Sequence, residues 1–321
     1  MASPNFTLII VNPSAAGGKA ERIFESIKGR LREELGELIV AVSRRPEDLA
    51  GHIDSAFAAG AERLIAVGGD GTNHAVINAL VNRSDEAAVS MAFGSLPVGT
   101  GSDWARGLGM PADLDTAVDW LARAQPTACD LGRAEYSDPK QGGRRVRRFF
   151  LNIASAGVSG EVDARVNRAR RRTSATFLRA TVATLLKYRP QPVVVDCDGE
   201  RFYEGSSYLL AAANGRYFGR GMWIAPNALI NDGLLDIVLV EGMPRLRILL
   251  ALQTVFSGRQ LSRKDVHCHR AASIRVRSEE GPLSLDLDGE EACGQDVQFT
   301  VLPGAIKILL HPAADKILKK A

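Results

Sequence analysis

The order of its predicted secondary-structure elements constrains the fold of this chain more than any other feature. Over about the first 130 residues, short apolar segments alternate with helical patterns, which is typical of a parallel sheet covered by helices. Strands are expected at residues 6–11, 38–43, 64–67 and 91–96, and helices at 20–35, 47–59, 73–81 and 115–124. This part is therefore predicted to be a doubly wound α/β domain.

The pattern changes after residue 131, because strand-like segments then follow one another. They cover residues 149–154, 193–197, 208–213, 235–240, 273–277, 283–287 and 297–302, and helical segments cover 160–188 and 245–256. Such clustering predicts a mostly antiparallel β-sandwich. We expect an α/β domain over residues 1–131 and a β-sandwich domain over 132–302. Residues 303–321 are expected to pack back on the first domain, and residues 137–148 to form an exposed hairpin.

Composition excludes several classes of protein. With 321 residues, 45% of them hydrophobic, the chain can form two globular domains. Its net charge of +3 is too small to predict nucleic-acid binding. No apolar segment approaches the roughly 20 residues of a membrane span, and the N-terminus lacks the pattern of a signal peptide. The four cysteines have no metal-binding spacing, and the run His267–Cys268–His269 is expected on a strand whose side chains alternate between faces. A cytoplasmic location is expected.

A glycine-rich turn, "GGDGTN" at residues 68–73, follows a predicted strand and opens a predicted helix. Its backbone amides are suited to hold phosphate oxygens. Asp70 would then face a Mg²⁺-bound nucleotide or a hydroxyl that must lose its proton, or else it caps the helix beginning near Thr72. Two familiar phosphate loops are excluded, because Pro13 and Ala20 break the Walker A pattern and Trp104 breaks the dinucleotide fingerprint.

Several motifs occur in a fixed order along nearly the whole chain: "VNPSAAGG" from Val11, "GGDGT" from Gly68, "LPVGTGSDWAR" from Leu96, "NGRYFGRGMWIAPNALINDGLLD" from Asn214 and "LDGE" from Leu287. In this order they resemble the diacylglycerol kinase catalytic-domain family, in particular its soluble bacterial lipid kinases. The resemblance implies ATP held between the two domains and transfer of its γ-phosphate to a lipid hydroxyl.

Specific residues follow from the same resemblance. It implies that the nucleotide is bound by Asn12, Pro13, Ser14, Ala15, Ala16, Ser43, Gly68, Gly69, Asp70, Gly71, Thr72, Asn73 and Thr100. It implies that Asp288 and Glu290 lie near the reacting hydroxyl, one of them as the general base, with Asp70 as the other candidate. It also implies a structural Mg²⁺ on Asp232 and the carbonyls of Leu235 and Ile237. A plain turn before a strand is the alternative for that segment.

Two positions depart from the family pattern. Ala75 stands where a glutamate is usual, and Ser102 stands where an asparagine is usual. These departures leave a non-catalytic nucleotide-binding protein as one alternative. An NAD kinase-like enzyme for a soluble metabolite is another, because NAD kinases share the "GGDGT" motif. Neither departure removes Asp70, Thr100, Asp103 or the "DGE" triplet. The predicted activity is therefore that of a lipid kinase using ATP and Mg²⁺.

A lipid substrate requires access to a membrane. The segment at residues 165–190 mixes arginines with apolar residues, and a second basic cluster, Arg144, Arg145, Arg147 and Arg148, precedes two phenylalanines. Such mixtures favour peripheral contact with anionic headgroups, and a solvated helix face is the alternative. The sequence makes no prediction about the oligomeric state.

Overall fold

The computed structural model describes residues 6–82, 90–98, 101–168 and 174–318. The chain forms two compact units: unit 1 comprises Met1–Asp130 with Gly304–Ala321, and unit 2 comprises Leu131–Pro303. The chain passes from one unit to the other twice, within the strands β5 (Gln125–Asp138) and β14 (Glu290–Leu310). Each unit is described by itself below.

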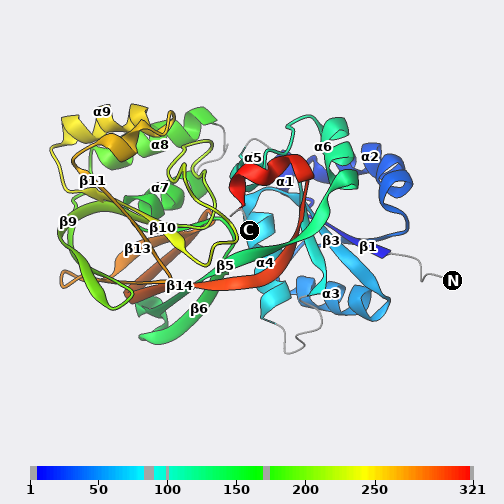
Figure 1. Cartoon of the computed structure of the whole chain (residues 1–321), viewed down its shortest axis with the longest axis horizontal. Coiled ribbons are helices and arrows are strands. Elements are labelled where there is room, and N and C mark those ends of the chain that lie inside the picture. The colour runs from blue at the N-terminus through cyan, green and yellow to red at the C-terminus, as the bar shows by residue number, and fades with distance from the viewer. Residues whose placement is uncertain (1–5, 83–89, 99–100, 169–173, 319–321) are drawn as a thin grey trace. The chain divides into compact units, whose positions relative to one another are not determined.

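Unit 1 is a parallel sheet with helices packed on it (Figure 1). Its strands are β1 (Phe6–Val11), β2 (Leu38–Val42), β3 (Ala61–Gly68), β4 (Ala92–Pro97) and the last part of β14. Its helices are α1 (Ala15–Gly18), α2 (Ala20–Leu35), α3 (Asp48–Ala58), α4 (Asp70–Val81), α5 (Asp103–Gly107) and α6 (Leu114–Arg123), with a 3-10 segment at Pro312–Ile317. Helix α2 packs against α6, and α3 packs against α4.

The strand order in unit 1 is β2-β1-β3-β4-β14, and each of these pairs is parallel. Leu8, Ile9, Ile10 and Val11 of β1 are completely buried, as expected when helices cover both faces of a parallel sheet. The order along the sheet reverses between β1 and β3. Ligands of open α/β sheets bind outside the carboxyl ends of the strands at such a reversal.

Unit 2 is built mainly from antiparallel strands. Besides β5 and β14 it contains β6 (Arg144–Phe150), β7 (Ile153–Gly157), β8 (Gln191–Cys197), β9 (Glu200–Ala213), β10 (Leu235–Glu241), β11 (Val266–Ala271), β12 (Ser273–Arg277) and β13 (Leu283–Leu287). Its helices are α7 (Val158–Asn167), α8 (Ser174–Leu185) and α9 (Arg245–Val255), with 3-10 turns at Pro139–Gln141 and Arg259–Ser262.

Six strands of unit 2 pair in a closed ring, in the order β7-β9-β8-β12-β14-β13 and back to β7. An apolar core fills this ring, with Val195, Ile274, Leu285 and Phe299 completely buried. A second apolar cluster lies where α7, α8 and α9 cover the other face of β7 and β9 (Figure 1). The predicted fold class, a doubly wound α/β domain followed by a mostly antiparallel sandwich, is confirmed.

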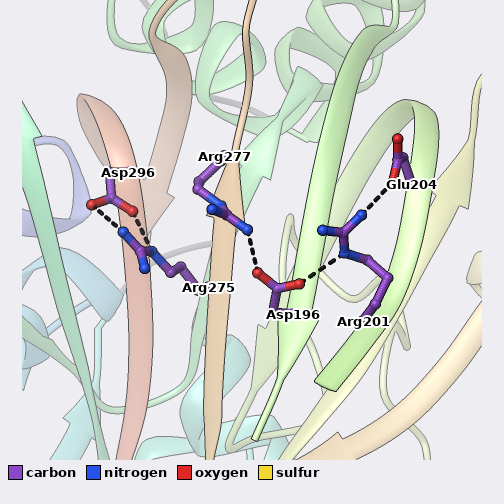
Figure 2. Close-up of polar contacts among 6 residues, drawn as sticks. All are labelled: Asp196, Arg201, Glu204, Arg275, Arg277 and Asp296. Carbon is purple, nitrogen blue, oxygen red and sulfur yellow. Dashed lines mark hydrogen bonds and ion pairs between the residues drawn. The ribbon is translucent and has the colours of Figure 1, made fainter. Parts of the chain in front are cut away.

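Charged side chains form a ladder across the strands β8, β9, β12 and β14 (Figure 2). Asp196 accepts hydrogen bonds from Arg201 and Arg277, and Arg201 also pairs with Glu204. Arg275 donates two hydrogen bonds to Asp296, from Nε at 2.6 Å and from Nη2 at 2.9 Å. Exposed pairs of this kind each stabilise a fold by at most about 1 kcal/mol, so their main effect is to keep this face of the ring polar.

The structure differs from the sequence-based expectation in several places, and two of them concern the candidate site. The helical segment expected at residues 160–188 is not one helix, since α7 ends at Asn167 and α8 begins at Ser174. The pattern predicts one strand at residues 149–154, but β6 ends at Phe150 and β7 begins at Ile153. The prediction is wrong because backbone amides at this point donate to the carboxylate of Asp288. The sequence pattern also did not predict helix α5. Its first amide is bound by the carboxylate of Asp70, which lies 33 residues earlier in the chain. Within the described residues, no helix is both long and apolar enough to cross a membrane.

Candidate functional site

The carboxyl edge of the sheet in unit 1 gathers most of the residues predicted to bind a nucleotide. The segment from Asn12 to Ala16 follows β1, Ser43 follows β2, and the turn from Gly68 to Asn73 ends β3 and opens α4. Since β2, β1 and β3 are neighbours, these segments lie at one edge, at the reversal of the strand order. Thr100 lies outside the described residues.

Asn12 ties the first of these segments to the glycine turn. Its Nδ2 donates to Thr72 Oγ1 at 2.9 Å, and its Oδ1 accepts from Ser14 N at 3.0 Å. Gly68 has to be a glycine, because a Cβ there would lie 2.3 Å from Thr72 Oγ1. The side chain of Thr72 therefore covers the end of β3, and the Asn12 amide fixes its hydroxyl.

Open backbone flanks this contact. Ala16, Gly17 and Gly18 have left-handed backbone angles, with φ of 53°, 66° and 84°. A Cβ added at Gly17, Gly18 or Gly69 would meet no atom within 4 Å. Asn73 Oδ1, in the first turn of α4, is buried and accepts no hydrogen bond from any described residue. This edge therefore combines accessible backbone with an unused polar atom, as a site for a polar ligand requires.

The carboxylate of Asp70 has a structural partner in unit 1. Its Oδ2 accepts from Asp103 N at 2.9 Å, and its Oδ1 accepts from Trp104 N at 3.2 Å. These are the first amides of α5, so Asp70 caps that helix rather than one beginning near Thr72. Helix α4 begins at Asp70 itself, and its N-cap Gly69 makes no side-chain cap. The start of α5 is thus held against the glycine turn.

The segment "LDGE" forms the hairpin turn between β13 and β14 in unit 2. Asp288 and Gly289 have φ of 55° and 91°, as the commonest two-residue hairpin turn requires. The Asp288 carboxylate is buried and accepts three backbone N–H groups: Leu151 N at 2.7 Å, Asn152 N at 2.9 Å and Ile153 N at 3.0 Å. Both oxygens of Asp288 are thereby engaged within the protein.

The side chain of Glu290 differs from that of Asp288 in its exposure. It is the first residue of β14, and its side chain is exposed. Across residues 6–82, 90–98, 101–168 and 174–318, nothing forms a hydrogen bond or ion pair with this carboxylate. Of the two carboxylates predicted in this turn, Glu290 is therefore the one whose oxygens are available to a ligand.

The same "DGE" triplet occurs a second time, which the sequence analysis missed. Cys197–Asp198–Gly199–Glu200 joins β8 to β9, and Asp198 and Gly199 have φ of 49° and 89°. The Asp198 carboxylate accepts from Ala272 N at 3.3 Å and from Ser273 N at 2.8 Å, but this residue is exposed. The triplet thus specifies a hairpin turn in both places, and only the surroundings distinguish the two copies.

The predicted metal ligands lie at the start of β10. The Asp232 carboxylate is almost completely buried and pairs with Arg270, and its Oδ1 accepts from Leu234 N at 3.1 Å. Asp236 also pairs with Arg270, at 3.6 Å, and burial raises the pKa of Asp236 to about 6. Leu235 and Ile237 lie on β10 itself, which has paired strands on both sides. The segment is therefore both a turn before a strand and a cluster of acidic oxygens.

The run from His267 to His269 lies on β11, as predicted. His267 Nε2 is 2.6 Å from Glu241 Oε1, whereas the ring of His269 stacks on Phe202 with centroids 5.2 Å apart. The two imidazoles thus have different partners. No group of three or more histidine, cysteine, aspartate or glutamate side chains that could hold a metal ion occurs in the described parts of the chain.

Known proteins resemble both units. The family model of the diacylglycerol kinase catalytic domain matches residues 7–134, and that of the YegS C-terminal NAD kinase beta sandwich-like domain matches residues 152–310. A diacylglycerol kinase of Mycobacterium tuberculosis is 27% identical over 303 residues, which cover 94% of this chain and 93% of that protein. A Stenotrophomonas maltophilia protein named "Probable lipid kinase YegS-like" is 27% identical over 319 residues, which cover 99% of both chains.

Solved structures share the fold. A diacylglycerol kinase structure from Bacillus anthracis superimposes with a TM-score of 0.70 at 21% identity, covering 98% of this chain and 100% of that chain. A yeast NADH kinase superimposes with a TM-score of 0.51 at 11% identity, covering 99% of this chain and 85% of the other. At these identities the structural likeness concerns the fold alone.

Proposed function

The chain belongs to the diacylglycerol kinase catalytic-domain family, and on this premise we propose that it is a lipid kinase that transfers the γ-phosphate of ATP to a lipid hydroxyl. One observation carries the proposal: the carboxyl edge of unit 1, where the Asn12–Thr72 contact stands beside the left-handed run from Ala16 and the open glycine turn. Backbone amides at such an edge can hold the phosphates of a nucleotide.

We assign the proton transfer to Glu290. In the reaction, the lipid oxygen bonds to the γ-phosphorus while the bond to the bridging oxygen of ADP breaks, and the hydroxyl proton leaves to a base. The oxygens of Asp288 are engaged by three amides, and those of Asp70 by the start of α5. Glu290 Oε is therefore the proposed acceptor of the proton. Magnesium bound to ATP would neutralise the negative charge of the phosphates.

We locate the proposed structural magnesium ion at the acidic cluster of β10. Asp232 Oδ2 and Asp236 Oδ2 are buried there, and both form ion pairs with Arg270. Oxygen ligands of this kind are those that Mg²⁺ prefers. We propose that the Asp232 carboxylate and the carbonyls of Leu235 and Ile237 hold the ion, which would then share Asp232 with Arg270.

One assay separates this function from its alternatives. Purified protein is incubated with labelled ATP, Mg²⁺ and a panel of diacylglycerol, phosphatidylglycerol, sphingoid and ceramide lipids, with NAD in parallel. We expect a phosphorylated lipid. Phosphorylated NAD would instead indicate an NAD kinase, and nucleotide binding without product would indicate a regulatory protein. We propose the cytoplasm as the location, since ATP is available there.

Asp70 provides a test of the nucleotide site. Asp70→Ala is expected to lower the Tm by about 2–6 °C, because it removes the cap of α5, and to weaken ATP binding by releasing the start of α5 from the glycine turn. Asp113→Ala is the matched control, since Asp113 caps α6 through Thr116 N at 2.9 Å. We expect the control to lower the Tm similarly and to leave ATP binding unchanged in calorimetry. Equal losses of ATP binding in both variants would contradict the assignment.

An apolar surface on α8 and α9 supports peripheral contact with a membrane. The exposed large hydrophobic residues of unit 2 are Leu178, Leu186, Leu246, Leu250 and Phe256, with exposed fractions of 43–71%. Exposed basic residues accompany them, namely Arg179, Lys187, Arg189, Arg245, Arg247 and Arg259. Helix α8 contacts α9, and a cavity of about 170 Å³ lies among residues of α8, α9 and the segment 219–222. The combination suits docking on anionic headgroups.

Two arginines of the second predicted basic cluster, Arg145 and Arg147, have acidic partners. Arg145 lies 3.7 Å from Asp296, and Arg147 lies 3.4 Å from Glu135 across the hairpin of β5 and β6. These pairs reduce the positive charge that the hairpin offers to a membrane. We therefore propose that docking uses the surface of α8 and α9, of which the predicted segment 165–190 supplies only α8 and its flanks.

Liposome sedimentation tests this surface. The double variant Leu246→Ser with Leu250→Ser is expected to bind anionic vesicles at least about 10-fold more weakly, because each buried leucine contributes roughly 1.5–3 kcal/mol. Binding of the unmodified protein should rise with the anionic lipid fraction and fall with salt. Val42→Ser is the control, since Val42 is exposed to 36% on β2 of unit 1. Unchanged binding of the double variant would contradict the proposal.

A further inference from the structure

A carboxyl group is buried beside the "DGE" turn. Asp286 lies on β13, is 5% exposed, and stands between Leu285 and Leu287, which fill the ring core. Since side chains alternate along a strand, Asp286 points away from that core. Its partners across the ladder on the same face are Ser155 of β7 and Glu291 of β14.

Helix α7 packs closely on β13 at Gly160. A Cβ at Gly160 would lie 2.7 Å from Leu285 O and 2.8 Å from Leu285 N, so α7 and β13 meet without an intervening side chain. Asp163 follows one turn later, on the same side of the helix. This packing brings the carboxyl group of Asp163 within hydrogen-bonding reach of that of Asp286.

Two carboxyl groups can share a hydrogen bond only if one of them carries a proton. Burial raises the pKa of Asp286 well above its usual range, and the adjacent Asp163 raises it further, with a smaller contribution from Asp288. Burial likewise raises the pKa of Asp163 to about 6; the hydrogen bond with Asp286 lowers this pKa, and the charges of Glu290 and Glu291 on β14 raise it. The charged groups that act on the pair, Asp288, Glu290 and Glu291, are acidic, and they favour keeping a proton between the two carboxyls.

The pair also holds the turn. Asp286 Oδ1 accepts from Gly289 N at 2.7 Å, and Gly289 lies between Asp288 and Glu290. A chain of contacts therefore runs from α7 through Asp163 and Asp286 to the backbone that carries Glu290. The rigid backbone contact at Gly160 anchors the other end of that chain.

The second copy of the turn shows that a hairpin of this kind does not need such a pair. Asp196 occupies the same place, two residues before Asp198, but it is held by Arg201 and Arg277 (Figure 2). The hydrogen bonds of these arginines lower the pKa of Asp196. The aspartate two residues before the turn thus lies beside arginines in one hairpin, as Asp196, and beside acidic residues in the other, as Asp286.

We propose that Asp163 and Asp286 share one proton, and that this carboxyl pair positions the Gly289–Glu290 turn for proton transfer. Loss of the shared proton would leave two adjacent carboxylates, whose repulsion releases the turn from α7. The positioning role rests on the proposed function, whereas the sharing of the proton does not. Both are testable in the full chain.

Carboxyl NMR tests the shared proton. With ¹³Cγ-labelled aspartate, two coupled aspartates are expected to titrate well above the usual range in the unmodified protein. Asp286→Asn and Asp163→Asn should each remove this coupled titration, and Asp196→Asn should preserve it. A coupled titration that survives both substitutions, or none at all, would overturn the proposal.

Turnover tests the positioning role. Asp286→Ala is expected to lower kcat about 10-fold or more, with the KM for ATP unchanged, because small displacements of a reacting group are costly. Asp286→Asn should restore kcat, since its amide can accept from Gly289 N and donate to Asp163. The kcat of the unmodified protein should fall as the pair loses its proton at high pH, and that of Asp286→Asn should not. Matching pH profiles would overturn the positioning role. If no lipid is phosphorylated, the proposed function fails while the NMR titration still decides the shared proton.

Discussion

Replacing Glu290 with glutamine is expected to lower turnover of the lipid substrate at least about 100-fold, with little change in ATP binding or Tm. General bases contribute roughly 10²–10⁴-fold to the rate of such reactions. The side chain is exposed and has no bonding partner within the described residues, so the fold does not depend on its charge. Initial rates with labelled ATP, together with thermal unfolding of the same sample, measure both expectations.

The second hairpin supplies the control for this variant. Glu200 follows Asp198 and Gly199 in a turn with nearly the same backbone angles, and its side chain is also exposed. Glu200→Gln should retain the full rate. If it lost as much activity as Glu290→Gln, or if Glu290→Gln stayed active, Glu290 would not be the base.

Asp288→Asn is expected to destabilise unit 2 by about 3 kcal/mol, because hydrogen bonds to a charged acceptor contribute roughly 1.5–3 kcal/mol each. Asparagine keeps one acceptor oxygen but turns an NH₂ group toward backbone donors at Leu151, Asn152 or Ile153. The urea midpoint should fall. Hydrogen exchange at these amides should become faster than at amides elsewhere in β7.

Asp198→Asn is the matched control for stability. Its carboxylate accepts only two backbone amides, at 2.8 and 3.3 Å, and the residue is exposed. We expect a loss of about 1 kcal/mol, since water can replace the missing acceptor. Equal destabilisation by both variants would show that burial is not what makes Asp288 important to the fold.

Elements with strong periodicity could be predicted from the sequence with little error. The helix expected at residues 20–35 and the strands at 6–11, 273–277 and 283–287 match the structure residue for residue. Their boundaries follow from local apolar spacing. The break between β6 and β7 could not be predicted, because it depends on Asp288, which lies 137 residues away from Leu151 in the chain.

The candidate site likewise has features that the sequence could predict and others that it could not. The glycine turn after β3 was recognisable because glycines between a strand and a helix form a local pattern. The partners of Asp70 and Asp288 were not recognisable, because both carboxylates bind amides that only the tertiary fold brings near. Asp286 is marked in the sequence by its place in the alternating segment "LSLDL", where it is an acidic residue on the face opposite the leucines.

Strand β14 has a consequence for the order in which the protein can be completed during synthesis. Its last part pairs with β4 through Lys307 and Ile308, and Leu309 packs over Gly94, where a Cβ would approach it to 2.9 Å. The sheet that begins with Phe6 therefore lacks this strand until Lys307 and Ile308 have left the ribosome. The pairings of β14 within the ring of unit 2 end at Thr300, so the ring can close before the sheet of unit 1 is complete.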